Sequence, residues 1–313
     1  MKRIVILSSL ALILLFSFVR LSTFLNEKNE FSGGILIKMP INSAQRGIVQ
    51  LNKWKEFFPG NSLNDSTFQI ENTIFKFKRK MVTGLEFESY EKNNASLKWS
   101  CDINAIELGD STFISFSLTQ PKFEKKLWSN LSNYFKSKNQ EMYYENICKA
   151  ASSYFESMEH VYGFKFNETN VKYSILLSTN MTSTDTPSVK TIYELIDKLR
   201  KVLKEKGENP LDSPMLNTTR IETNLISTTV AIPIQHQFAV SGIISMKNMV
   251  LGRILEAPVN GGVNEIKKAF DAMEYYKMDR QKMSPAMPFE TLLNYRLTLP
   301  DSLWKTKISL PVY

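Results

Sequence analysis

Apolar and polar side chains alternate along several stretches in the first half of the chain. Between residues 96 and 103 every second side chain is apolar: Leu97, Trp99, Cys101 and Ile103. Since successive side chains of a strand point to opposite faces, this spacing predicts a strand with one buried face. A second stretch repeats the spacing with Ile114, Phe116 and Leu118. We also predict a strand over residues 34–39 and one or two short helices over residues 45–58.

A spacing of three and four residues predicts one long helix, from Asn139 to Tyr162. Its apolar positions are Tyr143, Ile147, Ala151, Tyr154, Met158 and Val161. These positions share one face of a helix with about 3.6 residues per turn, and Gly163 is placed to end the helix. Strands, small helices and one long C-terminal helix predict an α+β domain over residues 26–166.

Residues 168–313 contain the same series of elements twice. A helix predicted between Pro187 and Gly207 has the apolar stripe Val189, Ile192, Ile196, Leu199 and Leu203. A second stripe follows 74 residues later, at Val263, Ile266, Phe270 and Met273. Predicted strands at residues 171–177 and 249–255 precede the two helices, and two strand regions follow each helix. Each half is therefore predicted as strand, helix and two strands, and two such units would pair their sheets.

The first domain resembles the helix-grip domains of the START/polyketide-cyclase (SRPBCC) superfamily. The residues that carry the resemblance are GILIKMP, VQLNKWKEFFPG and YENICKAASSYFESMEHVYGFKF. It implies an antiparallel sheet that grips an apolar ligand against the long helix, and it supplies no catalytic residue. Trp54, Trp99 and Phe116 are expected either to pack the core or to line a ligand cavity. A scaffold whose cavities are filled by side chains is a further alternative.

The duplicated domain resembles the GyrI-like family, also called the bacterial transcription-activator effector-binding domain, whose halves are of the SHS2 type. The strongest stretches are PFETLLNYRLTLPDSLWKTKISLPV and the preceding helix GGVNEIKKAFDAMEYY. Pro288, Phe289 and Glu290 match the family's Pro-aromatic-Glu pattern. The family's ending is matched by Trp304, Thr306, Ile308, Pro311 and Val312. Leu292 stands where the family has a tyrosine, a departure that concerns the ligand preference rather than the fold.

This second resemblance implies that Glu290 lies at the base of an aromatic cleft between the two halves. A carboxylate in a low-dielectric cleft attracts a cation more strongly than one in water, and aromatic rings add about 0.5–2 kcal/mol. Burial would raise the pKa of an unpaired Glu290. The expected aromatic ligand-binding residues are Trp304, Tyr295, Tyr275, Tyr276 and Phe289, with Tyr193 and Glu222 as weaker candidates. The residues alone also allow a solvated Glu290 and tyrosines that pack a core.

We expect a protein that binds a small apolar molecule, with or without a positive charge, for sensing or sequestration. The alternative is a hydrolase of reactive small molecules in which Glu290 is the general base. The two histidines, the absence of a GxSxG motif and the absence of a Gly-rich phosphate loop give no catalytic residue and no cofactor. The lack of a CxxC or Cys/His cluster gives no metal site. Cys101 and Cys148 are expected to form one disulfide or to remain buried thiols.

The net charge of +8 adds little, because the lysines are spread along the chain and predict no nucleic-acid partner. The N-terminus is more informative. Lys2 and Arg3 precede an apolar run from Ile4 to Val19, and no small-residue cleavage site or cysteine follows it. Residues 1–25 are therefore predicted as a membrane anchor, with the rest of the chain outside the cytoplasm on the periplasmic side of a bacterium. A cleaved signal peptide and secretion are the alternative.

Overall fold

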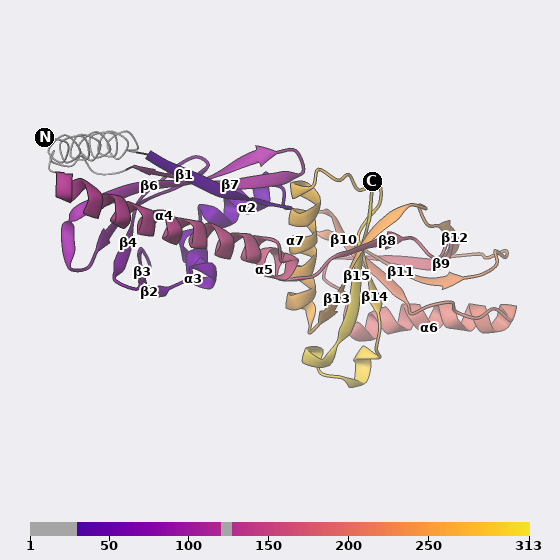
Figure 1. The fold of residues 1–313 in the computed structure, drawn as a ribbon. Coiled ribbons are helices and arrows are strands. Elements are labelled where there is room, and N and C mark those ends of the chain that lie inside the picture. Colours follow the sequence, from indigo (N-terminus) through magenta and orange to yellow (C-terminus); the bar gives the residue numbers. More distant parts are fainter. Residues whose placement is uncertain (1–29, 120–126) are drawn as a thin grey trace, which may run out of the picture. The chain divides into compact units, whose positions relative to one another are not determined.

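The computed structural model describes residues 30–119 and 127–313, which form two compact units, one up to Ser157 and one from Met158 onward (Figure 1). This division precedes the predicted boundary at residues 166–168, because Tyr162 and Phe166 pack inside the second unit. Their ring centroids lie 5.4 and 5.1 Å from that of Tyr276. The predicted anchor lies outside the described residues. None of the helices within them combines the length and apolar composition needed to cross a membrane.

The first unit is a seven-stranded antiparallel sheet with one long helix against it. The sheet order is β1-β7-β6-β5-β4-β3-β2. The strands are β1 (Glu30–Ile37), β2 (Asn61–Asn64), β3 (Thr67–Ile70), β4 (Thr73–Lys80), β5 (Gly84–Glu91), β6 (Asn94–Leu108) and β7 (Ser111–Thr119). The helices α2 (Ile41–Ile48), η1 (Leu51–Lys53) and α3 (Trp54–Phe57) follow β1, and α4 (Leu127–Phe155) follows β7 and packs against β1 and β7. The predicted α+β class is confirmed.

The long helix differs from its prediction at both ends. α4 begins twelve residues before Asn139 and ends at Phe155, and a short α5 (Met158–Tyr162) follows after two residues. At the interruption the Ser157 N–H donates to the Tyr154 carbonyl at 3.2 Å, so the last turn of α4 is tightened. The apolar spacing continues across this break, which is why periodicity could not detect it. Gly163 ends α5 with a left-handed φ of 79°, as predicted.

Large aromatic side chains form the core of the first unit. Trp54, Trp99 and Phe116 are each exposed by 1% or less. The Trp54 ring centroid lies 4.7 Å from that of Phe87 and 5.1 Å from that of Phe57, and its Nε1 donates to the Ile48 carbonyl at 2.8 Å. Of the two roles predicted for these three residues, the structure shows core packing.

The second unit is an eight-stranded antiparallel sheet in the order β12-β9-β11-β10-β14-β15-β13-β8. Its strands are β8 (Asn167–Asn170), β9 (Ile175–Ser183), β10 (Met215–Glu222), β11 (Leu225–Ile234), β12 (Ile244–Asn248), β13 (Arg253–Asn260), β14 (Phe289–Leu292) and β15 (Lys305–Val312). Its longer helices are α6 (Val189–Lys206) and α7 (Val263–Asp279), and η2 (Arg296–Thr298) and η3 (Asp301–Leu303) lie between β14 and β15.

The register of this sheet is the same on both sides of its centre. Met215 pairs with Ala231, and Phe289 and Ser309, which lie 74 and 78 residues further on, also pair. β10 and β14 pair with each other in the middle, where Leu216 lies opposite Glu290. These two positions are themselves 74 residues apart. The Leu216–Glu290 pair therefore marks the place where the two halves meet.

The two long helices cover the sheet with apolar stripes that were largely predictable. α6 packs Ile196, Leu199 and Leu203 into a core with Leu216 and Leu292, which places α6 on the sheet face of Leu216. In α7 the predicted stripe is wrong at Val263, the first residue of the helix, which is 63% exposed. The buried side of α7 runs instead through Ile266, Ala269, Met273 and Tyr276.

Candidate functional site

Glu290 lies on the short strand β14, between the central strand β10 and the last strand β15. It pairs with Leu216 on one side and Ile308 on the other, so its side chain shares their face of the sheet. The side chain is 18% exposed, and its Oε2 lies 3.0 Å from Nη2 of Arg296. Glu290 is thus a mostly buried carboxylate, as the resemblance implied, but it already has a positively charged partner.

Arg296 is the residue that sequence reasoning missed. It opens η2 with a side chain that is 5% exposed, and its Nη2 also donates to Thr306 Oγ1 at 2.6 Å. The guanidinium carbon lies 4.6 Å from the centroid of the Trp304 ring, within the range of a cation–π contact. Its Nε finds no hydrogen-bond partner among the described residues. Arg296 therefore occupies the place between carboxylate and indole that we had expected a ligand cation to take.

The charge balance around Glu290 follows from these contacts. Burial raises the pKa of Glu290, while the charge and the hydrogen bond of Arg296 act in the opposite direction without cancelling the rise. The expectation of an unpaired carboxylate is corrected. A positive residue six positions after the acid was visible in the sequence, but only the return of the chain at η2 brings the two side chains together.

A pocket of about 360 Å³ adjoins this charge pair. Its walls come from both halves: Tyr193 and Arg200 of α6, residues 210–214, Ile232 of β11, and residues 292–295 after β14. The Tyr193 hydroxyl accepts from the Arg296 backbone N–H at 2.9 Å and donates to the Asn294 carbonyl at 3.2 Å. The ring centroids of Tyr193 and Tyr295 lie 4.8 Å apart, edge to face. Tyr193 therefore links the pocket wall to the segment that carries Arg296.

The remaining predicted residues lie elsewhere in the second unit. Phe289 precedes Glu290 on the strand, so it points to the opposite sheet face, where it lines two smaller pockets. Tyr276 packs against Tyr162 under the guanidinium of Arg280, and Tyr275 is 54% exposed on α7. The structure thus brings together Glu290, Trp304 and Tyr295, joined by Tyr193 and Arg296, and does not add the other predicted aromatic residues.

The structure also describes the cysteines and the groups that could hold a metal ion. Cys101 and Cys148 are buried free thiols, and burial raises the pKa of Cys148 to about 12. Nowhere in the described part of the chain do three or more His, Cys, Asp or Glu side chains gather in a way that could hold a metal ion.

Comparisons with known proteins give structural matches alone. No protein-family model matches the chain, and no curated protein matches it. The EcmrR C-terminal domain matches with 14% identity over 48% of this chain and 98% of its own, at a TM-score of 0.41. EcmrR in a complex with DNA matches with 12% identity over 59% and 64%, at 0.41. SAV2435 bound to tetraphenylphosphonium matches with 13% identity over 48% and 94%, at 0.33. Since these TM-scores are below 0.5, the proposals below rest on the residues of this chain.

Proposed function

We propose that residues 158–313 bind a small, largely apolar molecule in the pocket of about 360 Å³. The observation that carries the proposal is the composition of its walls, which both halves supply. Tyr193, Tyr295, Ile232 and Leu292 give it aromatic and aliphatic surface, and Arg200, Asp212 and Asn294 add a few polar groups. Sites for small molecules combine such features at volumes of about 300–1,000 Å³. Sensing or sequestration of the bound molecule is the use that we propose.

The charge pair beside the pocket sets the ligand preference that we propose. Glu290 already accepts from Arg296, and the Trp304 ring already faces a guanidinium. A cationic ligand would be repelled by Arg296 unless that side chain moved away. We therefore propose a neutral ligand for the natural chain, and a cationic ligand only for a chain in which Arg296 is displaced. The hydrolase alternative has no observation in its favour, because a general base at Glu290 would first have to lose its bond to Arg296.

Thermal unfolding of the full-length chain with a panel of neutral apolar compounds and the lipophilic cation tetraphenylphosphonium tests this proposal. A neutral compound at 100 times its Kd should stabilise the wild-type chain by about 2.7 kcal/mol. Tyr295→Ala should weaken that stabilisation, because Tyr295 lines the pocket and is half exposed. Arg296→Met should make tetraphenylphosphonium stabilising. A panel in which no compound stabilises the wild type, or in which Tyr295→Ala responds equally, would overturn the proposal.

We further propose the finer assignments of fold and place. The series of one strand, two helices, six strands and a long helix supports a helix-grip domain in the first unit. The matching register of β10–β11 and β14–β15 supports two copies of one SHS2-type unit in the second. The membrane anchor, the extracytoplasmic location and the lack of a nucleic-acid partner rest on the sequence. Protease treatment of intact cells should degrade the chain if it lies outside the cytoplasm.

A further inference from the structure

The sheet face opposite α6 carries a groove of its own. Leu216 and Leu292 pack with α6, so their strand neighbours Met215 and Thr291 point to the other face. On that face lies a pocket of about 130 Å³, whose apolar walls are Leu176, Met215, Ala231, Met249, Met287 and Phe289. Methionine side chains are flexible and polarizable, and they adapt to ligands of irregular shape. This surface therefore suits a flexible hydrocarbon chain.

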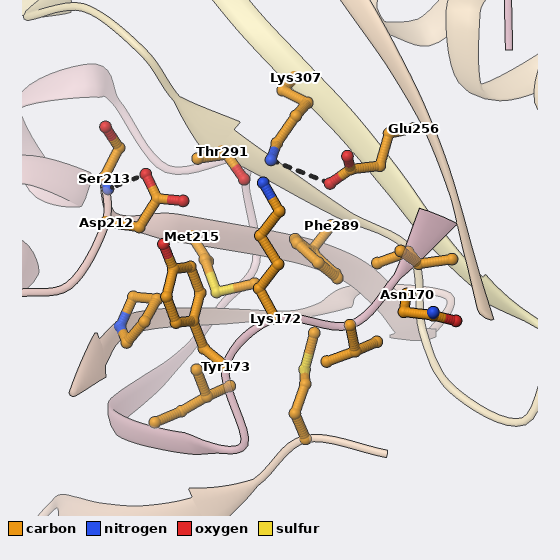
Figure 2. A pocket seen from close by; sticks show the side chains of 15 residues that line it. Asn170, Lys172, Tyr173, Asp212, Ser213, Met215, Glu256, Phe289, Thr291 and Lys307 are labelled. Atoms are coloured by element: carbon orange, nitrogen blue, oxygen red, sulfur yellow. Dashed lines mark hydrogen bonds and ion pairs between the residues drawn. The ribbon is translucent and has the colours of Figure 1, made fainter. Parts of the chain in front are cut away.

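A second pocket, of about 40 Å³, continues the groove (Figure 2). Both pockets share Leu176, Met215, Met249 and Phe289 as walls. Figure 2 shows the ammonium groups of Lys172 and Lys307 pointing toward one another beside Thr291. Since about 10–15 Å³ of such volume holds one water, the smaller pocket has room for a carboxylate and the larger one for a chain of several methylenes.

The charges at the small pocket leave one ammonium without a counter-charge. Lys307 lies 2.9 Å from Glu256, and Asp212 accepts from the Ser213 backbone N–H at 2.7 Å. Lys172 is exposed and has no ion-pair partner among the described residues. Two ammonium groups that face one space repel each other, and an anion between them would relieve that repulsion. The polar end of the groove is therefore suited to a negatively charged head group.

We propose that this groove binds an amphipathic carboxylate, a fatty-acid-like molecule, as a second ligand of the protein. Its carboxylate lies between Lys172 and Lys307, and the Thr291 hydroxyl lines the same space. Its hydrocarbon chain runs over Met215, Phe289 and Met249 toward Met287. The site lies on the opposite sheet face from Glu290 and does not depend on the ligand proposed for the larger pocket.

Calorimetric titration of the full-length chain with octanoate, decanoate and dodecanoate tests the proposal. The affinity should rise about fourfold per added methylene while the chain still fits the groove. Decanoate methyl ester should bind at least tenfold more weakly than decanoate, because it lacks the charge. Lys172→Met keeps the apolar stem of the side chain and removes its ammonium, so it should weaken decanoate binding at least tenfold.

The matched control is Lys190→Met, which removes an exposed lysine of α6. Both Lys190→Met and Tyr295→Ala should bind decanoate as the wild type does. Equal binding of decanoate by wild type and Lys172→Met, or equal binding of acid and ester, would overturn the proposal. Loss of neutral-compound binding in Tyr295→Ala with decanoate binding retained would separate the two sites.

Discussion

At the scale of single residues, Arg296 determines how the candidate site behaves. Its side chain is 5% exposed and holds Glu290 and Thr306 by hydrogen bonds of 3.0 and 2.6 Å. Glu290 could be predicted because it follows Pro288 and Phe289 in a recognisable pattern. Arg296 could not, because its role depends on a turn after β14 that local spacing does not describe. The site therefore differs from its prediction in the charge that faces the pocket.

Arg296→Met should destabilise the chain by about 3 kcal/mol at pH 7, because it leaves the Glu290 carboxylate buried and unpaired. The double variant with Glu290→Gln should recover most of that loss, since it removes the unpaired charge. Urea unfolding followed by tryptophan fluorescence measures both. A double variant that is no more stable than Arg296→Met would contradict this account.

The pH dependence of stability provides a second test of the pair. Burial raises the pKa of Glu290 above its usual value of 4.5. For an acid whose pKa is raised by folding, the stabilisation is fully present below the usual pKa and is lost as the pH rises through the raised value. The wild type should therefore lose stability relative to Glu290→Gln as the pH rises from about 4.5. Melting temperatures across that range, compared between the two chains, measure it. A constant difference would contradict the raised pKa.

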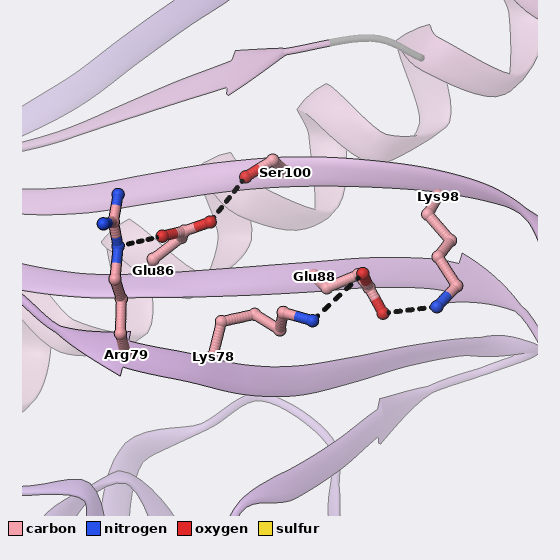
Figure 3. Close-up of polar contacts among 6 residues, drawn as sticks. All are labelled: Lys78, Arg79, Glu86, Glu88, Lys98 and Ser100. Carbon is pink, nitrogen blue, oxygen red and sulfur yellow. Dashed lines mark hydrogen bonds and ion pairs between the residues drawn. The ribbon is translucent and has the colours of Figure 1, made fainter.

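At the scale of elements, alternation identified strands well because one face of each sheet is solvated. Figure 3 shows this outer face in the first unit. Glu88 of β5 lies between Lys78 of β4, at 3.4 Å, and Lys98 of β6, at 2.9 Å. The hydrogen bond from Lys98 is the main cause that lowers the pKa of Glu88. Such cross-strand pairs stabilise one register, and on an exposed face each contributes at most about 1 kcal/mol.

The ends of helices were predictable where a cap exists. α6 begins after Ser188, whose Oγ accepts from the Thr191 N–H at 3.1 Å, and ends at Gly207 with φ 71°. α4 has no comparable signal for the two-residue break after Phe155, and its helical spacing continued into α5. Caps therefore set boundaries that periodicity alone misses.

Ser188→Ala should destabilise the chain by about 1 kcal/mol, because the first turn of α6 loses the oxygen that satisfies a backbone donor. Ser188→Asp should retain most of the stability, since its carboxylate can accept from the same N–H and lies at the positive end of the helix. Urea unfolding of the two variants measures the difference. Equal losses in both would show that the hydroxyl does not act as a cap.

At the scale of the whole molecule, the two-unit organisation and the α+β class were predictable from the sequence. The boundary was not, because it depends on which unit buries the aromatic residues after α5. Tyr162 settles this in favour of the second unit, where its hydroxyl donates to the buried Asp279 at 2.8 Å. A contact between residues 117 positions apart leaves no trace in local patterns. Long-range pairing of this kind is what sequence reasoning lacks at every scale.

The central pairing of Leu216 with Glu290 has a consequence for how such a sheet can be assembled. Side chains directly opposite each other on antiparallel strands have Cβ atoms about 4.5–5.5 Å apart, and like charges there are destabilising. Two identical halves that each carried the acid would set two carboxylates against one another at the seam. A single chain avoids this, because each half can change alone. The glutamate at this position is therefore compatible with covalent fusion of unequal halves and not with a symmetric pair of separate copies.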